Sequence, residues 1–245
     1  MKLTIIGCWG AYPPANEATS AYLLEKDGFR LLIDCGSGAI SQIQNFVDLS
    51  ELDALIVSHY HHDHKADIGC LQYNMFLQRI GGLRSSAFPI YGHCKEPEQF
   101  SALNYMNYTE GREITAHTSV VIGPWTVTFC ETNHPSYCLA MRFDDGEHTF
   151  VYTADTHWTD DMVHFCSDCD LLLSECSVYD HDVSVSSGHL TPELTGKLAQ
   201  QSRARQLIIT HLPHYGAHED ILQRVTAIYS GPAQLAAKGS VIYFA

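Results

Sequence analysis

The chain has 245 residues, of which 45% are hydrophobic, so it can bury a sizeable core within one large domain. Lys and Arg total 14 against 28 for Asp and Glu, and the net charge of -14 disfavours an extended nucleic-acid surface. The nine cysteines lack the spacing of a disulfide framework and no apolar run approaches membrane-spanning length, so we expect a cytoplasmic protein with reduced thiols and no membrane contact.

The first half of the chain begins with antiparallel strands and continues with alternating helices and strands. Asp27-Gly28 is a hairpin signal between two apolar runs. Apolar residues then recur at helical spacing from Ile40 to Val47 and from Ile68 to Phe76. The expected strands are 3–6, 20–25, 29–33, 54–57 and 88–91, and the expected helices are 40–47, 68–76 and 97–107.

The second half repeats this plan. Its expected strands are 120–122, 125–131, a hairpin over 138–152, 171–175, 207–210 and 241–244, and its expected helices are 159–166, 191–204 and 219–229. The repetition predicts two sheets packed face to face with helices outside. We therefore expect an α/β (α+β) fold, a four-layer αββα sandwich, formed by residues 1–245 as a single domain of two pseudo-repeated halves.

The segment from Ser58 to His64 carries several metal-binding side chains directly after an apolar strand. Imidazole and carboxylate groups suit zinc, manganese or iron. In a tight turn, His59 and His61 can be directed at one point while Asp63 and His64 face another, so one segment could serve two ions. The alternative is an exposed His-rich loop.

Three further candidate ligands follow later strands. His134 comes after the strand 125–131, Asp155 after the hairpin 138–152, and His211 after the strand 207–210. Each alone is explained as a turn or strand-end residue. Together with the first segment, they place a candidate ligand at four separate strand ends, which favours a metal site built from both halves.

In these residues the sequence resembles the metallo-β-lactamase superfamily, whose HxHxDH signature is present in His59-x-His61-x-Asp63-His64. His134, Asp155 and His211 fall where its third, fourth and fifth motifs belong. Within the superfamily the chain is most similar to the ribonuclease Z branch. The segments that carry this second resemblance are 7–13, 32–36, 89–92, 174–176 and 188–191.

The resemblance implies two divalent metal ions, zinc with manganese as the alternative. The implied ligands are His59, His61 and His134 for one ion, Asp63, His64 and His211 for the other, and Asp155 as the bridge. It further implies a metal-bridging hydroxide as the nucleophile, with Asp63 orienting that water. His189, supported by Glu175, would stabilise the developing charge or protonate the leaving oxygen, which makes Asp63, His189 and Glu175 the expected catalytic residues.

The absence of a long arm, which is found in part of the ribonuclease Z branch, narrows the range of expected substrates. Members that clamp transfer RNA carry a long arm between the third and fourth motifs, whereas only a hairpin fits between His134 and Asp155. We expect a phosphodiesterase acting on an RNA 3′ end or on a small cyclic or short nucleotide phosphodiester. The alternatives are a thioester or lactone hydrolase and a non-catalytic nucleotide-binding protein. The resemblance is also compatible with a homodimer.

Several other residues are open to two interpretations. Cys166-x-x-Cys169 could bind metal or cycle between redox states, or its thiols could simply pack in the interior. His157 follows Asp155 closely and is expected to support it. Residues 83–117 and the loop 176–188 are the remaining places where substrate-shaping elements could project.

Overall fold

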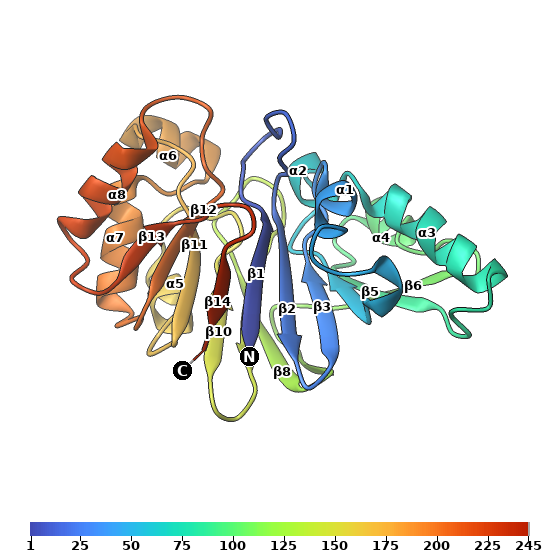
Figure 1. Ribbon diagram of the computed structural model, residues 1–245. Coiled ribbons are helices and arrows are strands. Elements are labelled where there is room, and N and C mark those ends of the chain that lie inside the picture. The colour runs from blue at the N-terminus through green and yellow to red at the C-terminus, as the bar shows by residue number, and fades with distance from the viewer. Residues whose placement is uncertain (245) are drawn as a thin grey trace. The chain divides into compact units, whose positions relative to one another are not determined.

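The computed structural model describes residues 1–244, with side chains described at all of these positions except 181 and 182. The chain divides into two compact units (Figure 1). Unit 1 consists of Met1–Thr115 and Ala237–Tyr243, and unit 2 consists of Ala116–Ala236 together with Phe244. Each unit contains one seven-stranded sheet.

The sheet of unit 1 comprises β1 (Lys2–Gly7), β2 (Ala21–Lys26), β3 (Phe29–Ile33), β4 (Ala54–Ile56), β5 (Phe88–Gly92), β6 (Thr109–Glu113) and β14 (Val241–Tyr243). Its strand order is β14-β1-β2-β3-β4-β5-β6, antiparallel as far as β3 and parallel from there on. Parallel neighbours require crossover connections, which contain the helices. These are α1 (Ala39–Ile43), the 3₁₀ turn η1 (Leu49–Glu51), α2 (His62–Lys65), α3 (Ile68–Ile80) and α4 (Pro97–Ser101).

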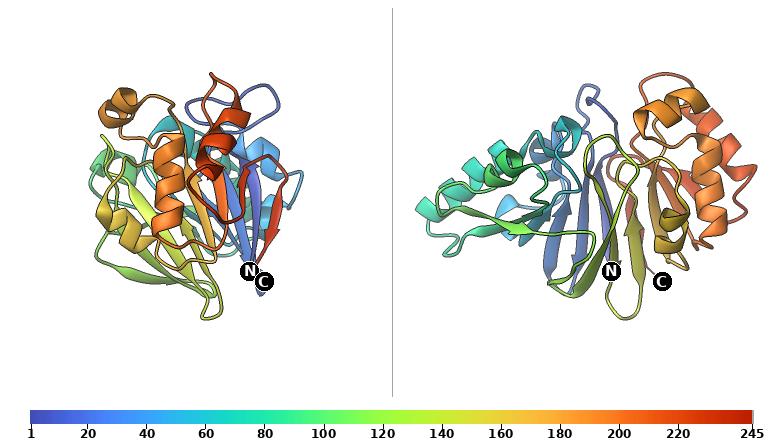
Figure 2. Two further views of the ribbon diagram at one scale, coloured as in Figure 1. Left: turned by 90° about the vertical axis from the view of Figure 1, so that its left-hand side faces the viewer. Right: turned by 180° about the vertical axis from the view of Figure 1, so that it is seen from behind.

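The sheet of unit 2 comprises β7 (Ser119–Ile122), β8 (Trp125–Glu131), β9 (Leu139–Asp144), β10 (Thr149–Tyr152), β11 (Leu171–Glu175), β12 (Leu207–Thr210) and β13 (Ala233–Leu235). It is antiparallel from β7 to β10 and parallel from β10 to β13. The helices are α5 (Asp160–Phe165), α6 (His181–Ser187), α7 (Pro192–Gln201) and α8 (His218–Thr226). Helix α7 packs on β11 and α8 on β13, as the orange and red helices of Figure 2 show.

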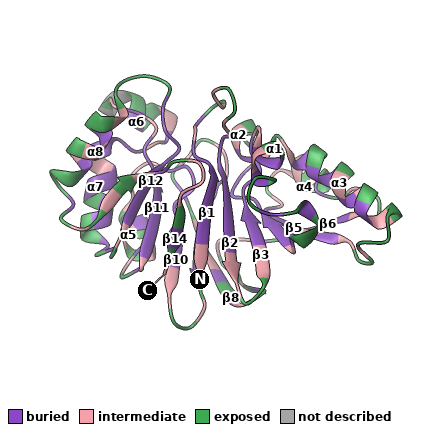
Figure 3. Cartoon of the chain, in the orientation of Figure 1, coloured by how far each residue is buried: buried purple, intermediate pink, exposed green. Residues whose placement is uncertain are grey.

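The core of each unit lies along its sheet, because the strands are largely buried while the helices and loops carry most of the exposed residues (Figure 3). All residues of β4, β11 and β12 are buried. Continuous burial is expected for parallel strands that are covered on both faces. The predicted plan of an antiparallel meander followed by alternating helix and strand, present twice, is therefore confirmed. The single-domain organisation stays a prediction.

Some predicted boundaries were wrong. The helix predicted over 97–107 ends at Ser101, because the chain turns at Leu103 and Asn104, whose oxygens accept hydrogen bonds from Thr109 Oγ1 and from the Gly111 amide. The helix predicted over 40–47 ends at Ile43. The sequence also did not indicate β6 and β13, which are edge strands without an apolar alternation, or the helix α6 within the predicted loop 176–188.

Three strands that have a parallel neighbour are followed by residues in the left-handed backbone region. Asp34 after β3, Ala154 after β10 and His211 after β12 have φ values of 55°, 50° and 53°. Such conformations cost about 1–3 kcal/mol each for residues other than glycine, and they persist only where the surrounding structure fixes them. Each turns the chain sharply at the strand end, which is where the candidate ligands are found.

Candidate metal centre

In unit 1, the chain leaving β4 directs two imidazoles toward each other. His59 is fully buried, His61 is exposed, and His59 Nε2 lies 3.1 Å from His61 Nδ1. Two nitrogen ligands bound to one tetrahedral zinc ion at 2.0–2.1 Å would be about 3.3 Å apart. The separation of these two nitrogens is therefore close to that of two ligands of one ion, and their role as ligands stays a prediction.

The neighbouring imidazole, His64, is oriented by a carboxylate that the sequence analysis did not single out. His64 Nδ1 lies 2.7 Å from Asp34 Oδ2, and both side chains are fully buried. Asp34 also accepts hydrogen bonds from the Ser58 amide at 2.7 Å and from Ser58 Oγ at 2.9 Å. Since a carboxylate oxygen only accepts, His64 donates through Nδ1 and keeps the Nε2 lone pair for a ligand.

The fourth residue of the motif, Asp63, is positioned by the N-terminal loop and by a glycine. The Ala11 amide donates to Asp63 Oδ2 at 2.8 Å. Behind it, a Cβ on Gly36 would lie 2.0 Å from the Asp63 carbonyl oxygen and 2.1 Å from Thr19 Oγ1. Only glycine permits this approach of two backbone segments. The segment 32–36 therefore supports the HxHxDH motif directly.

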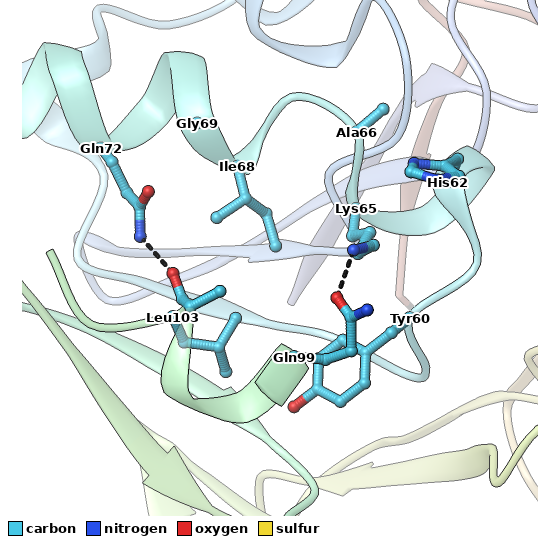
Figure 4. Close-up of a pocket in the computed structure, with 10 residues that line it drawn as sticks. Tyr60, His62, Lys65, Ala66, Ile68, Gly69, Gln72, Gln99 and Leu103 are labelled. Carbon is cyan, nitrogen blue, oxygen red and sulfur yellow. Dashed lines mark hydrogen bonds between the residues drawn. The ribbon is translucent and has the colours of Figure 1, made fainter. Parts of the chain in front are cut away.

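A pocket of about 220 Å³ in unit 1 is lined by residues of the motif segment and of the helical segments around α3 and α4 (Figure 4). Its lining includes His62 and Lys65, whose ammonium donates to Gln99 Oε1 at 2.5 Å. His59 and His61 do not line it. His62 therefore faces a different space from the candidate ligands, as its position outside the motif predicted.

In unit 2, the carboxylate of Asp155 lies between two imidazoles. Asp155 Oδ1 is 3.4 Å from His211 Nε2, and Asp155 Oδ2 is 4.0 Å from His134 Nε2. All three side chains are nearly inaccessible to solvent. His134 Nδ1 lies 3.2 Å from the Gly188 carbonyl, so this nitrogen carries the proton and Nε2 offers a lone pair. An aspartate with one oxygen toward each histidine is arranged as a bridging ligand requires.

Beside Asp155 lies the predicted pair of Glu175 and His189. His189 Nδ1 is 2.8 Å from Glu175 Oε1, and that oxygen also accepts from the Thr156 amide at 2.8 Å. The ligand-type atoms of Asp155, His189 and His211 all lie within 4.8 Å of one another. The His189 ring also contacts the His134 ring and stacks on the His211 ring. The structure therefore places this pair at the candidate metal ligands of unit 2.

His157 contacts two segments beside the candidate site of unit 2, and its expected support of Asp155 stays a prediction. Its Nδ1 lies 2.9 Å from Ser184 Oγ and 3.2 Å from the His189 carbonyl. Its amide donates to the Asn133 carbonyl at 2.8 Å. His157 therefore links the segments that carry His134 and His189.

The donor sets of both units fit divalent metal ions. Imidazole nitrogens and carboxylate oxygens are ligands that zinc and manganese share. In unit 1 the donors converge within the single segment 59–64. In unit 2 they converge from three strand ends onto Asp155. The assignment of the seven ligands to two particular ions stays a prediction.

Cys166 and Cys169 lie in the interior of unit 2. Burial raises the pKa of the Cys166 thiol well above 9.0 and that of Cys169 to about 12. Protonated thiols are poor nucleophiles and poor metal ligands. Among the described residues, no group of candidate metal ligands includes either cysteine. Of the two interpretations of this CxxC motif, the structure favours packing.

We expect iodoacetamide at pH 8 to alkylate the exposed Cys70 in the folded protein and to leave Cys166 and Cys169 intact, as mass spectrometry can show. The raised pKa of these two thiols also makes the free energy of unfolding depend on pH. Because the unfolded chain loses these protons first, the contribution of the two thiols to stability should be fully present below about pH 9. It should decrease as the pH rises toward 12. Alkylation of Cys169 at the rate of Cys70 would contradict the packing interpretation.

The chain resembles known proteins in both sequence and fold. A family model described as a beta-lactamase superfamily domain matches residues 29–212. The probable metallo-hydrolase YhfI of Bacillus subtilis is 42% identical over 98% of this chain and 99% of its own. Its crystal structure superposes with a TM-score of 0.96, covering 98% of each chain.

Two more distant relatives are ribonuclease Z enzymes by name. Ribonuclease Z of Haloferax volcanii is 25% identical, with 98% of this chain and 93% of the relative covered. The short form of human tRNase Z is 21% identical and shares the fold, with a TM-score of 0.79 over the full length of both chains. Among the described helices, none is long and apolar enough to cross a membrane.

These matches bear on the predicted fold, the predicted family and the predicted enzyme class. The α/β class, the metallo-β-lactamase fold and the similarity to the ribonuclease Z branch are as predicted. The predicted enzyme class, a metal-dependent hydrolase, is confirmed as well. With a matching family model over most of its length and a relative at 42% identity, the chain belongs to the metallo-β-lactamase superfamily.

Proposed function

We propose that this hydrolase is a phosphodiesterase that uses two divalent metal ions, zinc or alternatively manganese. The ions are held by the residues that the superfamily pattern assigns: His59, His61, Asp63, His64, His134, Asp155 and His211. The substrate is a small cyclic or short nucleotide phosphodiester or an RNA 3′ end. The observation that carries the proposal is the Glu175–His189 pair beside Asp155.

The pair favours a phosphodiester because of what the leaving group needs. An alkoxide expelled from a phosphodiester is a strong base and leaves readily only when it receives a proton or its charge is stabilised. A thiolate expelled from a thioester is a weak base and needs no such help. Glu175 accepts the Nδ1 hydrogen of His189, so the Nε2 side of the ring remains to face the substrate.

The remaining chemistry is divided among residues already described. Bound metal ions supply an acidified water and neutralise charge on the phosphoryl oxygens. Asp63, fixed by the Ala11 amide, can orient the attacking water or accept its proton. Thr191 caps α7 just beyond His189 by accepting from the Leu194 amide.

The short connection between His134 and Asp155 supports a substrate of limited size. This stretch consists of β9, β10 and the intervening turn at Asp145, whose Oδ1 accepts from the Glu147 and His148 amides. In the described chain no longer insertion projects there. The net charge of -14 likewise provides no long basic surface for RNA. The Haloferax relative is named ribonuclease Z, and this name supports cleavage of a phosphodiester bond by the present protein. Assembly as a homodimer stays a prediction.

Parallel assays on the metal-loaded protein test this proposal. We expect hydrolysis of bis-p-nitrophenyl phosphate, and more efficient hydrolysis of 2′,3′-cyclic nucleotides or short RNA ends than of a glutathione thioester. Treatment with a chelator should abolish turnover, and added zinc or manganese should restore it. Thioester cleavage with a silent phosphodiester assay would reject the proposal. Less than about one equivalent of metal after careful loading would reject the two-ion site.

A further inference from the structure

Ser177 connects two functional side chains of unit 2 that do not contact each other directly. Its hydroxyl donates to Glu175 Oε2 at 2.7 Å, and its Oγ lies 2.5 Å from His211 Nδ1. A second possible acceptor, the His211 carbonyl, is farther away at 3.2 Å. The single hydroxyl proton is better placed on the nearer carboxylate, since hydrogen bonds to ionised groups are stronger. Ser177 Oγ must then accept from His211.

The same arrangement occurs in unit 1. Ser58 Oγ donates to Asp34 Oδ2 at 2.9 Å and lies 3.1 Å from His59 Nδ1. It is also 3.4 Å from His64 Nδ1, but that nitrogen is 2.7 Å from Asp34 Oδ2 and donates there. Ser58 Oγ therefore accepts from His59. Both units thus contain a carboxylate that binds one histidine directly and a second one through a serine.

The consequence of each relay is a fixed tautomer. A serine whose proton is held by a carboxylate can only accept from the imidazole, so the imidazole carries its hydrogen on Nδ1. The Nε2 lone pairs of His59 and His211 are then available for a metal ion. In unit 2 this nitrogen is the atom that lies 3.4 Å from Asp155 Oδ1. The left-handed backbone of His211 brings its ring within reach of Ser177.

We infer that Ser58 and Ser177 are positioning residues that set the tautomer and orientation of one metal ligand each, His59 and His211. This inference rests on the proposed two-ion site. It assigns the serines to different ions, since His59 and His211 belong to different ligand sets. Each serine therefore acts chiefly on the affinity of one ion, and the direct Asp34–His64 hydrogen bond keeps the other ligand of unit 1 oriented without the Ser58 hydroxyl.

Metal titration of single variants tests the inference. In competition with a chromophoric chelator, Ser177→Ala should weaken one zinc equivalent by about 10- to 100-fold, and Ser58→Ala should weaken the other by a similar factor. Ser177→Thr retains the hydroxyl and should restore affinity to within about threefold of the parent protein. Ser202→Ala is the matched control, because it removes a buried hydroxyl that bonds only the Ala199 carbonyl within unit 2.

The His64→Ala background separates the two ions. It removes a ligand of the ion assigned to His211, so the remaining equivalent should respond to Ser58→Ala and be unaffected by Ser177→Ala. Unchanged affinities in both serine variants, with two ions bound by the parent protein, would overturn the inference and leave the proposed function standing. An equal loss of both ions that threonine does not rescue would also overturn it. Failure of the parent protein to bind two ions would instead reject the proposed function.

Discussion

His64→Ala is expected to lower kcat/KM for a phosphodiester by about 10³-fold or more, because a catalytic metal ion supplies several kcal/mol of transition-state stabilisation. The variant should also lose close to one equivalent of bound metal. The fold should survive, since Asp34 still accepts two hydrogen bonds from Ser58. We expect a stability loss of about 1–3 kcal/mol, because the buried carboxylate loses its imidazole partner. Steady-state kinetics, metal analysis and urea unfolding give the three quantities.

His62→Ala is the control for this experiment. His62 is exposed, lies between the proposed ligands His61 and Asp63 in sequence, and lines the separate pocket of unit 1 (Figure 4). Its removal should change kcat/KM by less than about threefold, since surface substitutions usually shift free energies by within 0.5 kcal/mol. Equal losses in both variants would contradict the ligand assignment.

His189→Ala has the second largest expected effect, a fall in kcat of about 10²- to 10⁴-fold with unchanged metal content. The physical reason is the loss of the group that stabilises or protonates the leaving oxygen. The loss should therefore depend on the leaving group. It should be smallest for p-nitrophenolate, which leaves without a proton, and largest for an alkoxide of a ribose.

A matched substitution for His189→Ala is His214→Ala, which removes an exposed histidine from the loop after β12. It should retain parental kinetics with every leaving group. If His189→Ala instead lost metal and slowed all substrates by the same factor, His189 would be a ligand rather than an acid. The grouping of Asp155, His189 and His211 within 4.8 Å makes this distinction necessary.

The sequence predicts the strands that deliver the site better than the two edge strands β6 and β13. β4, β10 and β12 are short apolar runs followed at once by polar residues, and this contrast places His59, Asp155 and His211 at strand ends. The edge strands β6 and β13 carry no such contrast. They are held by backbone pairing to one neighbour, which leaves no periodic signal in the side chains.

The supporting residues could not be predicted from the same patterns. Asp34, Ser58 and Ser177 are common residue types, and their roles depend on contacts between segments far apart in the chain. Asp34 meets His64 across 30 positions, and Ser177 meets His211 across 34. The signal that could have indicated Asp34 is an acidic residue directly after an apolar strand, which is the same signal that identified Asp155.

The pairing of β14 with β1 has a consequence for biosynthesis. Lys2, Leu3 and Thr4 pair with Tyr243, Ile242 and Val241, so β1 gains this neighbour only after the chain between them has been synthesised. At a translation rate of ~5–20 residues per second, β14 is synthesised roughly 12–48 s after β1. Throughout that interval its open edge is a template for pairing with other chains. Slower translation prolongs the time during which this edge of β1 is unpaired. In a chain without residues 241–243, β1 has no β14 to pair with.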